Sequence, residues 1–224
     1  MESIGQSNPT ITVAGNSPER IYVTEGNRDD ENIRRHIARY EFAARHIPAM
    51  ARILDCACGT GYGSQILTRR AKWSYLTGVD CSAEAIHYAR HHHQDTGDCY
   101  LHHRIEDLVL PPESMDAVVT LETIEHLPPD VCRQFLARAP SWVKPGGVVV
   151  ASSPMLRYKD GQPYVTSPYH INELPREELL AMLADAFPST GWVRHLYHQE
   201  QEAFLPLLDE HEGFCVMAAR RRMP

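Results

Sequence analysis

Long apolar runs, paired metal-binding cysteines and internal repeats are all missing from this chain of 224 residues. No apolar run approaches the roughly 20 residues that cross a bilayer, and residues 1–18 lack the basic-then-apolar order of a secretory signal. We therefore expect a cytoplasmic protein without membrane contact. The six cysteines show no C-x-x-C spacing, which favours small buried hydrophobes in a reducing compartment over disulfides or zinc ligands.

Basic stretches are also scarce: the formal net charge is −7, and the one run of basic residues is Arg220–Arg222. A protein that binds duplex DNA or long RNA normally presents a basic face, so nucleic acid is a disfavoured partner. The charge balance favours a small acceptor that is neutral or cationic. An apolar content of 43% and a length of 224 residues suit one globular domain with its own core. The sequence leaves the oligomeric state open.

Residues 52–64 are the stretch around which the rest is organised. A short apolar run, Ile53 and Leu54, ends in Asp55 and then breaks into a turn rich in glycine, and residues 65–70 open a helix. A buried strand, a glycine turn and a helix start form a ligand-binding corner of an open α/β sheet, because glycine lets the backbone approach a ligand closely. A second strand, 74–80, ends in Asp80, which is placed to accept both hydroxyls of a ribose.

This corner resembles the class I S-adenosylmethionine-dependent methyltransferases. The resemblance is carried by Leu-Asp-Cys-Ala-Cys-Gly-Thr-Gly-Tyr-Gly at 54–63 and by Gly-Val-Asp-Cys-Ser at 78–82. A dinucleotide dehydrogenase shares the strand, the turn and the second acid, but its G-x-G-x-x-G/A fingerprint requires Gly or Ala where this chain has Ser64. The family often has Gly where this chain has Ala57, and we expect a slightly tighter turn there without loss of binding.

The resemblance implies S-adenosyl-L-methionine as cofactor and assigns the residues that bind it. These are Asp55, Ala57, Cys58, Gly59, Gly61, Asp80, Cys81, Ile105, Glu106 and Leu121. Residues 55–61 shape the methionine side, Asp80 holds the ribose, and Ile105 flanks the adenine. Many members carry an acid where this chain has Arg104, so Glu106 is the substitute; the alternative for Glu106 is a plain surface acid.

The predicted fold is α/β: a Rossmann-like, seven-stranded, mostly parallel sheet with an antiparallel last strand and helices on both faces. After the first two strands we expect strands at 99–105, 115–121, 148–152, 192–197 and 213–219. The expected helices after the glycine turn are 82–94, 128–139 and 175–187, with a helix at 30–46 before it. The predicted organisation is a mobile tail at 1–17 and one methyltransferase domain at 18–224, with a cap segment at 18–50 and the core at 51–224.

A candidate catalytic group follows the fourth predicted strand. Glu122 and Glu125 are three residues apart and His126 is adjacent, so a helical turn there lets the three side chains converge. His170 lies in the loop after the neighbouring fifth strand. Two carboxylates with imidazole suit Mg²⁺, Mn²⁺, Fe²⁺ or Zn²⁺.

Glu-x-x-Glu-His with a later His resembles the metal-dependent 2′-O-methyltransferases of small-RNA 3′ ends, and a similar segment occurs in the ubiquinone-pathway O-methyltransferases. The resemblance implies Glu122, Glu125, His126 and His170 as metal ligands. A bound cation would activate the acceptor hydroxyl. Two alternatives stay open: metal-free base catalysis by His126 or His170, and a structural role for most of the group.

The predicted activity is methyl transfer from S-adenosylmethionine to a hydroxyl of a small metabolite or sugar-like group. The catalytic residues are Glu125, His126 and His170. Residues for the acceptor pocket are Arg35, His36, Tyr40, Tyr158, Tyr164 and Tyr169. Arg39 of the helix at 30–46 is a further possible substrate contact, and packing of this helix on the sheet edge with solvated arginines is the alternative. Methylation of RNA ends, N-methylation of an amine and a non-catalytic cofactor-binding module remain open.

Overall fold

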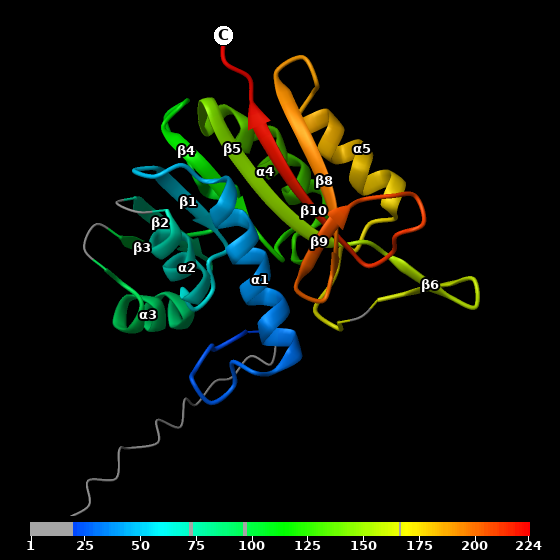
Figure 1. Cartoon of the computed structure of the whole chain (residues 1–224), viewed down its shortest axis with the longest axis horizontal. Coiled ribbons are helices and arrows are strands. Elements are labelled where there is room, and N and C mark those ends of the chain that lie inside the picture. Colours follow the sequence, from blue (N-terminus) through cyan, green and yellow to red (C-terminus); the bar gives the residue numbers. More distant parts are fainter. Residues whose placement is uncertain (1–19, 72–73, 96–97, 166) are drawn as a thin grey trace, which may run out of the picture.

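The main sheet of the computed structural model has eight strands, in the order β3-β2-β1-β4-β5-β10-β8-β9 (Figure 1). The structure describes residues 20–71, 74–95, 98–165 and 167–224, so the predicted tail at 1–17 lies outside the described residues. The strands are β1 (Arg52–Cys56), β2 (Tyr75–Asp80), β3 (Cys99–His102), β4 (Met115–Thr120), β5 (Val143–Pro154), β8 (Trp192–Glu200), β9 (Ala203–Pro206) and β10 (Phe214–Arg221).

The direction of the strands confirms the predicted mixed sheet. Strand β1 runs parallel to β2 and β4, β2 to β3, and β4 to β5, whereas β10 is antiparallel to both β5 and β8. The sheet has one strand more than the seven expected, because residues 203–206 fold back antiparallel on β8. Phe204 in this added strand stacks on Phe42 of the N-terminal helix, with ring centroids 4.4 Å apart.

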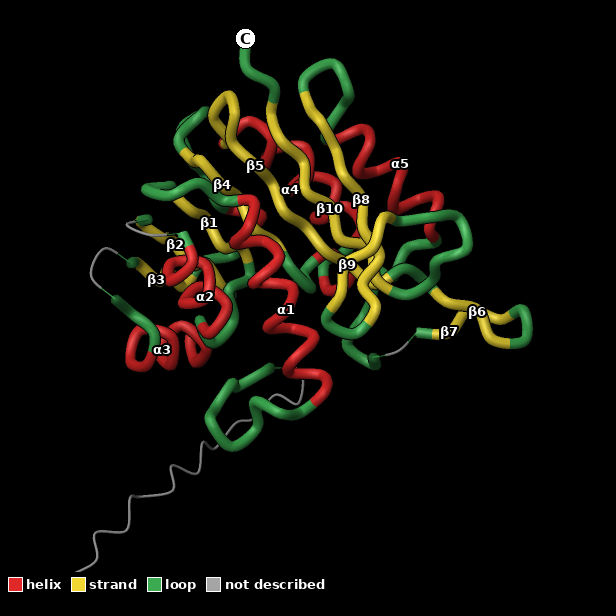
Figure 2. Tube along the Cα trace, viewed as in Figure 1, coloured by secondary structure: helices red, strands yellow, loops and turns green. Residues whose placement is uncertain are grey.

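Helices cover both faces of the sheet, as predicted (Figure 2). Helices α1 (Glu31–His46), α2 (Tyr62–Arg70) and α3 (Ala83–His92) pack on one face, and α4 (Pro129–Trp142) and α5 (Arg176–Ala186) on the other. Neighbouring residues of β1 alternate between the two cores, so Ile53 packs with the first set and Leu54 with the second. Two helix starts follow their capping residues: Asp30 accepts from two backbone amides of α1, and Ser82 accepts from one of α3.

The expected loop at 154–168 contains a hairpin that projects from the body of the domain (Figure 1). Its strands are β6 (Arg157–Lys159) and β7 (Gln162–Tyr164). The two residues between them, Asp160 and Gly161, both have positive φ, 53° and 75°. Asp-Gly is a preferred pair for the tight two-residue turn that this backbone forms, so the sequence held a hairpin signal that strand periodicity did not reveal.

None of the described helices combines the length and apolar character of a membrane span. The six cysteines are unpaired; Cys56, Cys58, Cys132 and Cys215 are buried, whereas Cys81 and Cys99 are exposed. The reversal of strand order between β1 and β4 opens a crevice at the carboxyl ends of these strands, which is where ligands bind in open α/β sheets.

Candidate functional site

A cavity of about 770 Å³ opens at this crevice, a size within the usual range of small-molecule sites. Its wall comes from the glycine turn, from the ends of β2 and β4, from α1 and from the loops that follow β3 and β7. The predicted cofactor residues on the wall are Ala57, Cys58, Gly59, Asp80, Cys81, Ile105, Glu106 and Leu121. The structure thus brings together most of the set that the sequence assigned to the cofactor.

Asp80 braces the glycine turn. Its two carboxylate oxygens accept from the backbone N–H groups of Gly59 at 2.9 Å and Ser82 at 2.8 Å. Gly59 has a φ of 54°, and a Cβ placed on it would meet nothing within 4 Å, so the backbone here faces open space. Ala57 also has a positive φ, 58°, which is a strained conformation for a residue with a Cβ.

Asp55 lies beneath the turn rather than on the cavity wall. It is fully buried and accepts hydrogen bonds from the Ser64 hydroxyl at 2.6 Å and the Tyr40 hydroxyl at 3.5 Å. Burial raises the pKa of Asp55 to about 7. Tyr40 in turn packs on Gly63, where a Cβ would lie 2.1 Å from its ring. Asp55 therefore supports the turn from below, and Tyr40, expected at the acceptor, directs its hydroxyl toward Asp55.

Glu106, the expected adenine-side acid, is held by a neighbouring arginine. Arg104 donates to its carboxylate at 2.6 Å, and both side chains line the cavity. The pair lies beside Ile105, in a short 3₁₀ turn, Ile105–Asp107. Glu106 thus reaches the cavity as an ion pair and not as an isolated acid.

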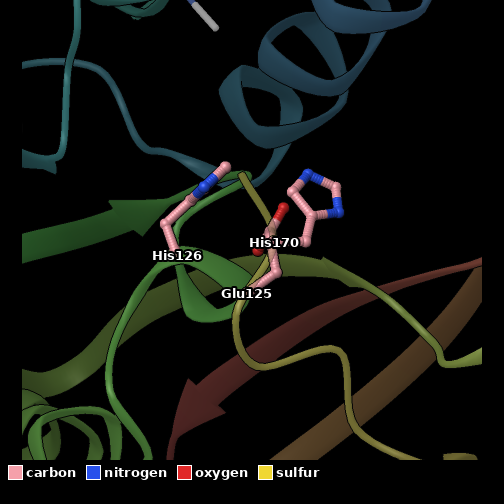
Figure 3. Close-up of side chains that lie close together, drawn as sticks. All are labelled: Glu125, His126 and His170. Atoms are coloured by element: carbon pink, nitrogen blue, oxygen red, sulfur yellow. The ribbon is translucent and has the colours of Figure 1, made fainter. Parts of the chain in front are cut away.

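Glu125, His126 and His170 lie close together, as Figure 3 shows, and the two histidines line the cavity. Each offers a ligand atom, and these atoms all lie within 4.8 Å of one another. Two backbone amides, those of Ile171 and Asn172, donate to the Glu125 carbonyl at 2.9 and 3.0 Å and tie the loop of His170 to the turn after β4. The two imidazole rings are 4.8 Å apart and nearly perpendicular.

The Glu125 side chain is buried, and within the described part of the chain neither carboxylate oxygen has a hydrogen-bond partner. Burial, and then the nearby charge of Glu122, raises its pKa well above the ordinary value. An unpartnered buried carboxylate is costly, so this oxygen pair is a natural place for a cation.

Glu173 is a member of this site that the sequence reasoning missed. Its Oε1 lies 2.5 Å from Nδ1 of His170, and its side chain is buried. The contact fixes the ring of His170 and leaves Nε2 as the atom that is available to a ligand or a proton. In the sequence, the three-residue spacing between His170 and Glu173 could have indicated that these two side chains are in contact.

Glu122, the fourth ligand expected, is not part of this group. Its Oε2 lies 3.0 Å from Nη1 of Arg39, and its Oε1 accepts from the Ser152 hydroxyl at 2.8 Å. Arg39 comes from α1, lies over the Phe214 ring at 4.1 Å, and donates from Nε to Gln199 at 2.5 Å. It is buried, unlike the solvated arginine that packing of α1 on the sheet edge would give.

Four of the residues expected at the acceptor line the cavity: Arg35, His36, Tyr40 and Tyr169. Burial, and then the charge of Arg39, lowers the pKa of His36 to about 3, so this ring is neutral near pH 7. Tyr158 and Tyr164 lie on the projecting hairpin, 54% and 49% exposed, away from the cavity wall. The hairpin turn, which the sequence analysis did not recognise, carries them outward.

Comparison with known proteins points to one family. Residues 53–147 match the family described as "Methyltransferase domain". The chain is 30% identical over 188 residues to a "Probable S-adenosylmethionine-dependent methyltransferase" of Mycolicibacterium smegmatis. This alignment covers 84% of this chain and 69% of that protein. It is 32% identical over 124 residues to the "Ubiquinone biosynthesis O-methyltransferase" of Xylella fastidiosa, but spans only 47% of its length.

The fold also recurs among solved structures. The plantazolicin methyltransferase BpumL, solved in complex with SAH, superposes with a TM-score of 0.66 over 88% of this chain and 86% of that one. At 15% sequence identity this likeness concerns the fold alone.

Proposed function

Because this chain belongs to the class I S-adenosylmethionine-dependent methyltransferase family, we propose that it methylates a hydroxyl group of a small molecule or sugar-like acceptor. The observation that carries this proposal is the group of Glu125, His126 and His170, in which the two imidazoles line the cavity and the buried Glu125 lies beside them. A sulfonium methyl group is already reactive, so the site has to activate the acceptor oxygen. The O-methyltransferase of ubiquinone biosynthesis among the relatives supports oxygen as the methylated atom.

The residues at the glycine turn fit the cofactor. The open space in front of Gly59 admits a ligand against the backbone, and the Asp80 carboxylate faces the same cavity, where ribose hydroxyls can donate to it. Ile105 offers an apolar surface for the adenine. Leu121 follows β4 directly and lines the same cavity as the glycine turn, His126 and His170, so the methyl donor and these histidines share one cavity.

We further propose that Glu125, His126 and His170 hold a divalent cation. One carboxylate and two imidazoles suit Mn²⁺, Fe²⁺ or Zn²⁺, and the buried, unpartnered oxygens of Glu125 fit such an ion. When bound, the ion lowers the pKa of a hydroxyl that coordinates it. Glu173 orients the ring of His170. Because Arg39 neutralises Glu122, that carboxylate supplies no ligand in this arrangement.

The contact between His170 and Glu173 also supports a second mechanism without an ion. Here Nε2 of His170 takes the proton of the acceptor hydroxyl, and the Glu173 carboxylate stabilises the imidazolium that forms. His126 then positions the acceptor. In both mechanisms the C–S bond of the sulfonium breaks as the methyl group bonds to the acceptor oxygen, and S-adenosylhomocysteine is released. The hydroxyl proton passes to Nε2 of His170 in the mechanism without an ion, and would pass to solvent in the mechanism with one.

The experiment is methyl transfer to a panel of hydroxyl compounds, followed by release of demethylated cofactor, before and after thorough treatment with EDTA. Loss of the activity and its recovery with a divalent ion support the metal site. Glu125→Gln then lowers the rate roughly 10- to 100-fold, whereas Glu178→Gln on the exposed face of α5 does not. Activity that survives EDTA and is not raised by any ion leaves base catalysis. In that case His170→Ala abolishes the rate, and Glu173→Gln lowers it.

Adding amines and short RNAs to the panel tests the other three candidate functions: N-methylation, methylation of RNA ends and cofactor binding without catalysis. An amine needs little activation, so an amine substrate leaves Glu125→Gln fully active. Rapid methylation of a short RNA at its 3′ end, with no small hydroxyl compound accepted, would reject the small acceptor. Tight cofactor binding without turnover on any substrate would indicate a binding module.

A further inference from the structure

The cavity is cationic, although the whole chain is acidic. Five arginines line it, Arg20, Arg35, Arg39, Arg104 and Arg157, against three carboxylates, Asp80, Glu106 and Glu122. The net charge of the chain is −7, so this excess of positive charge is local. A concave site concentrates the field of the charges that line it and selects ligands of opposite sign.

The carboxylates of the cavity are already engaged. Glu122 pairs with Arg39 and Glu106 with Arg104. Asp80 accepts two backbone N–H groups at the cofactor corner. Two of the five cavity arginines, Arg39 and Arg104, are therefore paired with the two glutamates of the cavity.

Arg157 is an arginine of the cavity wall outside these pairs. It begins strand β6, is half-buried, and lines the cavity together with His170 and Phe214. Its Nη2 would lie 3.1 Å from a Cβ placed on Gly213, so the guanidinium rests against the backbone at the start of β10. Among the residues that the structure describes, no carboxylate forms an ion pair with Arg157. Arg35, by contrast, pairs with Glu31 on the exposed face of α1.

We propose that the acceptor carries a carboxylate or phosphate group, which Arg157 binds while the acceptor hydroxyl lies at His126 and His170. This inference rests on the proposed function, because it names the class of acceptor for that site. The planar guanidinium accommodates either anion with two parallel hydrogen bonds. An anionic acceptor differs from the neutral or cationic acceptor that the net charge of the chain favoured. Net charge describes the whole surface, whereas selection depends on the few charges inside the cavity.

The test measures binding to protein saturated with S-adenosylhomocysteine, so that the carboxylate of the cofactor cannot occupy the site. The calorimetric probes are two matched pairs: 3,4-dihydroxybenzoate with its methyl ester, and glucose 6-phosphate with glucose. At least one charged probe binds roughly tenfold more tightly than its neutral partner, and the preferred pair distinguishes carboxylate from phosphate. Arg157→Gln removes this preference and Arg157→Lys keeps part of it. Arg133→Gln, on the exposed face of α4, leaves it unchanged.

Equal binding of charged and neutral probes, absence of binding by any of them, or a preference that survives in Arg157→Gln would overturn the proposal. Tighter binding of a short single-stranded RNA than of either charged probe would overturn the assignment to a small acceptor. The same probes, incubated with S-adenosylmethionine, test the proposed function separately. If the charged probes bind more tightly but are not methylated, the anion site is retained and O-methylation of these acceptors is rejected. If the probes are methylated without a preference for the charged ones, O-methylation is retained and the anion site is rejected.

Discussion

Replacing Asp55 by Asn should change how the stability of the protein depends on pH. Asp55 is fully buried beneath the glycine turn, and burial raises its pKa from 3.8 to about 7. Between these two values the folded protein keeps the proton while the unfolded chain releases it. The contribution of Asp55 to stability is therefore complete below about pH 4 and is lost as the pH rises to about 7.

The size of this effect follows from the pKa difference. A difference of one in pKa corresponds to about 1.36 kcal/mol, so the free energy of unfolding should fall by roughly 3 kcal/mol between about pH 4.5 and pH 7.5 through this one group. Asn has nearly the same shape and does not titrate. Its amide oxygen can still accept from the Ser64 hydroxyl, so the variant lacks this contribution without opening a cavity.

Urea unfolding of both proteins without cofactor, at several pH values across this range, measures the effect. Other titrating groups act in both proteins, and they cancel when the two free energies of unfolding are subtracted at each pH. We expect the wild type to lose roughly 3 kcal/mol relative to Asp55→Asn as the pH rises. A difference that stays constant with pH would show that Asp55 is ionised in the folded protein throughout, and would refute the reasoning.

Three further predictions concern packing around the site. Gly63→Ala should destabilise the protein by about 1–3 kcal/mol, because the new Cβ would lie 2.1 Å from the Tyr40 ring; thermal unfolding that matches the wild type would contradict this packing. Arg39→Met should cost roughly 3–5 kcal/mol, because it leaves Glu122 without its partner, and adding Glu122→Gln should recover much of the loss. Additive costs in that double-mutant cycle would mean that the two side chains are not coupled. Ala57→Gly should stabilise the protein by up to about 1 kcal/mol, because glycine relieves the strain of a φ of 58°; a lower midpoint in urea would contradict it.

The parts of the site that lie close together in the sequence were predictable. The strand, glycine turn and helix of residues 52–70 follow from local preferences, and the place of Asp80 follows from the regular spacing of a parallel sheet. The pairing of β1 with β4 then brings Leu121 and His126 to the same crevice. These features depend on the periodicity of apolar residues and on the order of the strands, and both can be recognised in a single sequence.

The contacts that reach across the fold were not predictable. Arg39 of α1 pairs with Glu122, which is 83 positions further along the sequence, and no local pattern in either segment indicates this contact. The pattern Glu-x-x-Glu-His therefore grouped Glu122 with Glu125 and His126, whereas in the structure Glu122 pairs with Arg39. The charge of the cavity was likewise invisible, because Arg157 comes from a hairpin whose position depends on its turn.

Binding of the cofactor is the measurement that tests the central claim most directly. We expect calorimetry to show that S-adenosylmethionine and S-adenosylhomocysteine each bind at a single site, and that Asp80→Ala loses this binding at least roughly tenfold while circular dichroism shows an intact fold. Nicotinamide and flavin nucleotides should not bind. Binding of these nucleotides, with no association of either S-adenosyl compound, would contradict the account.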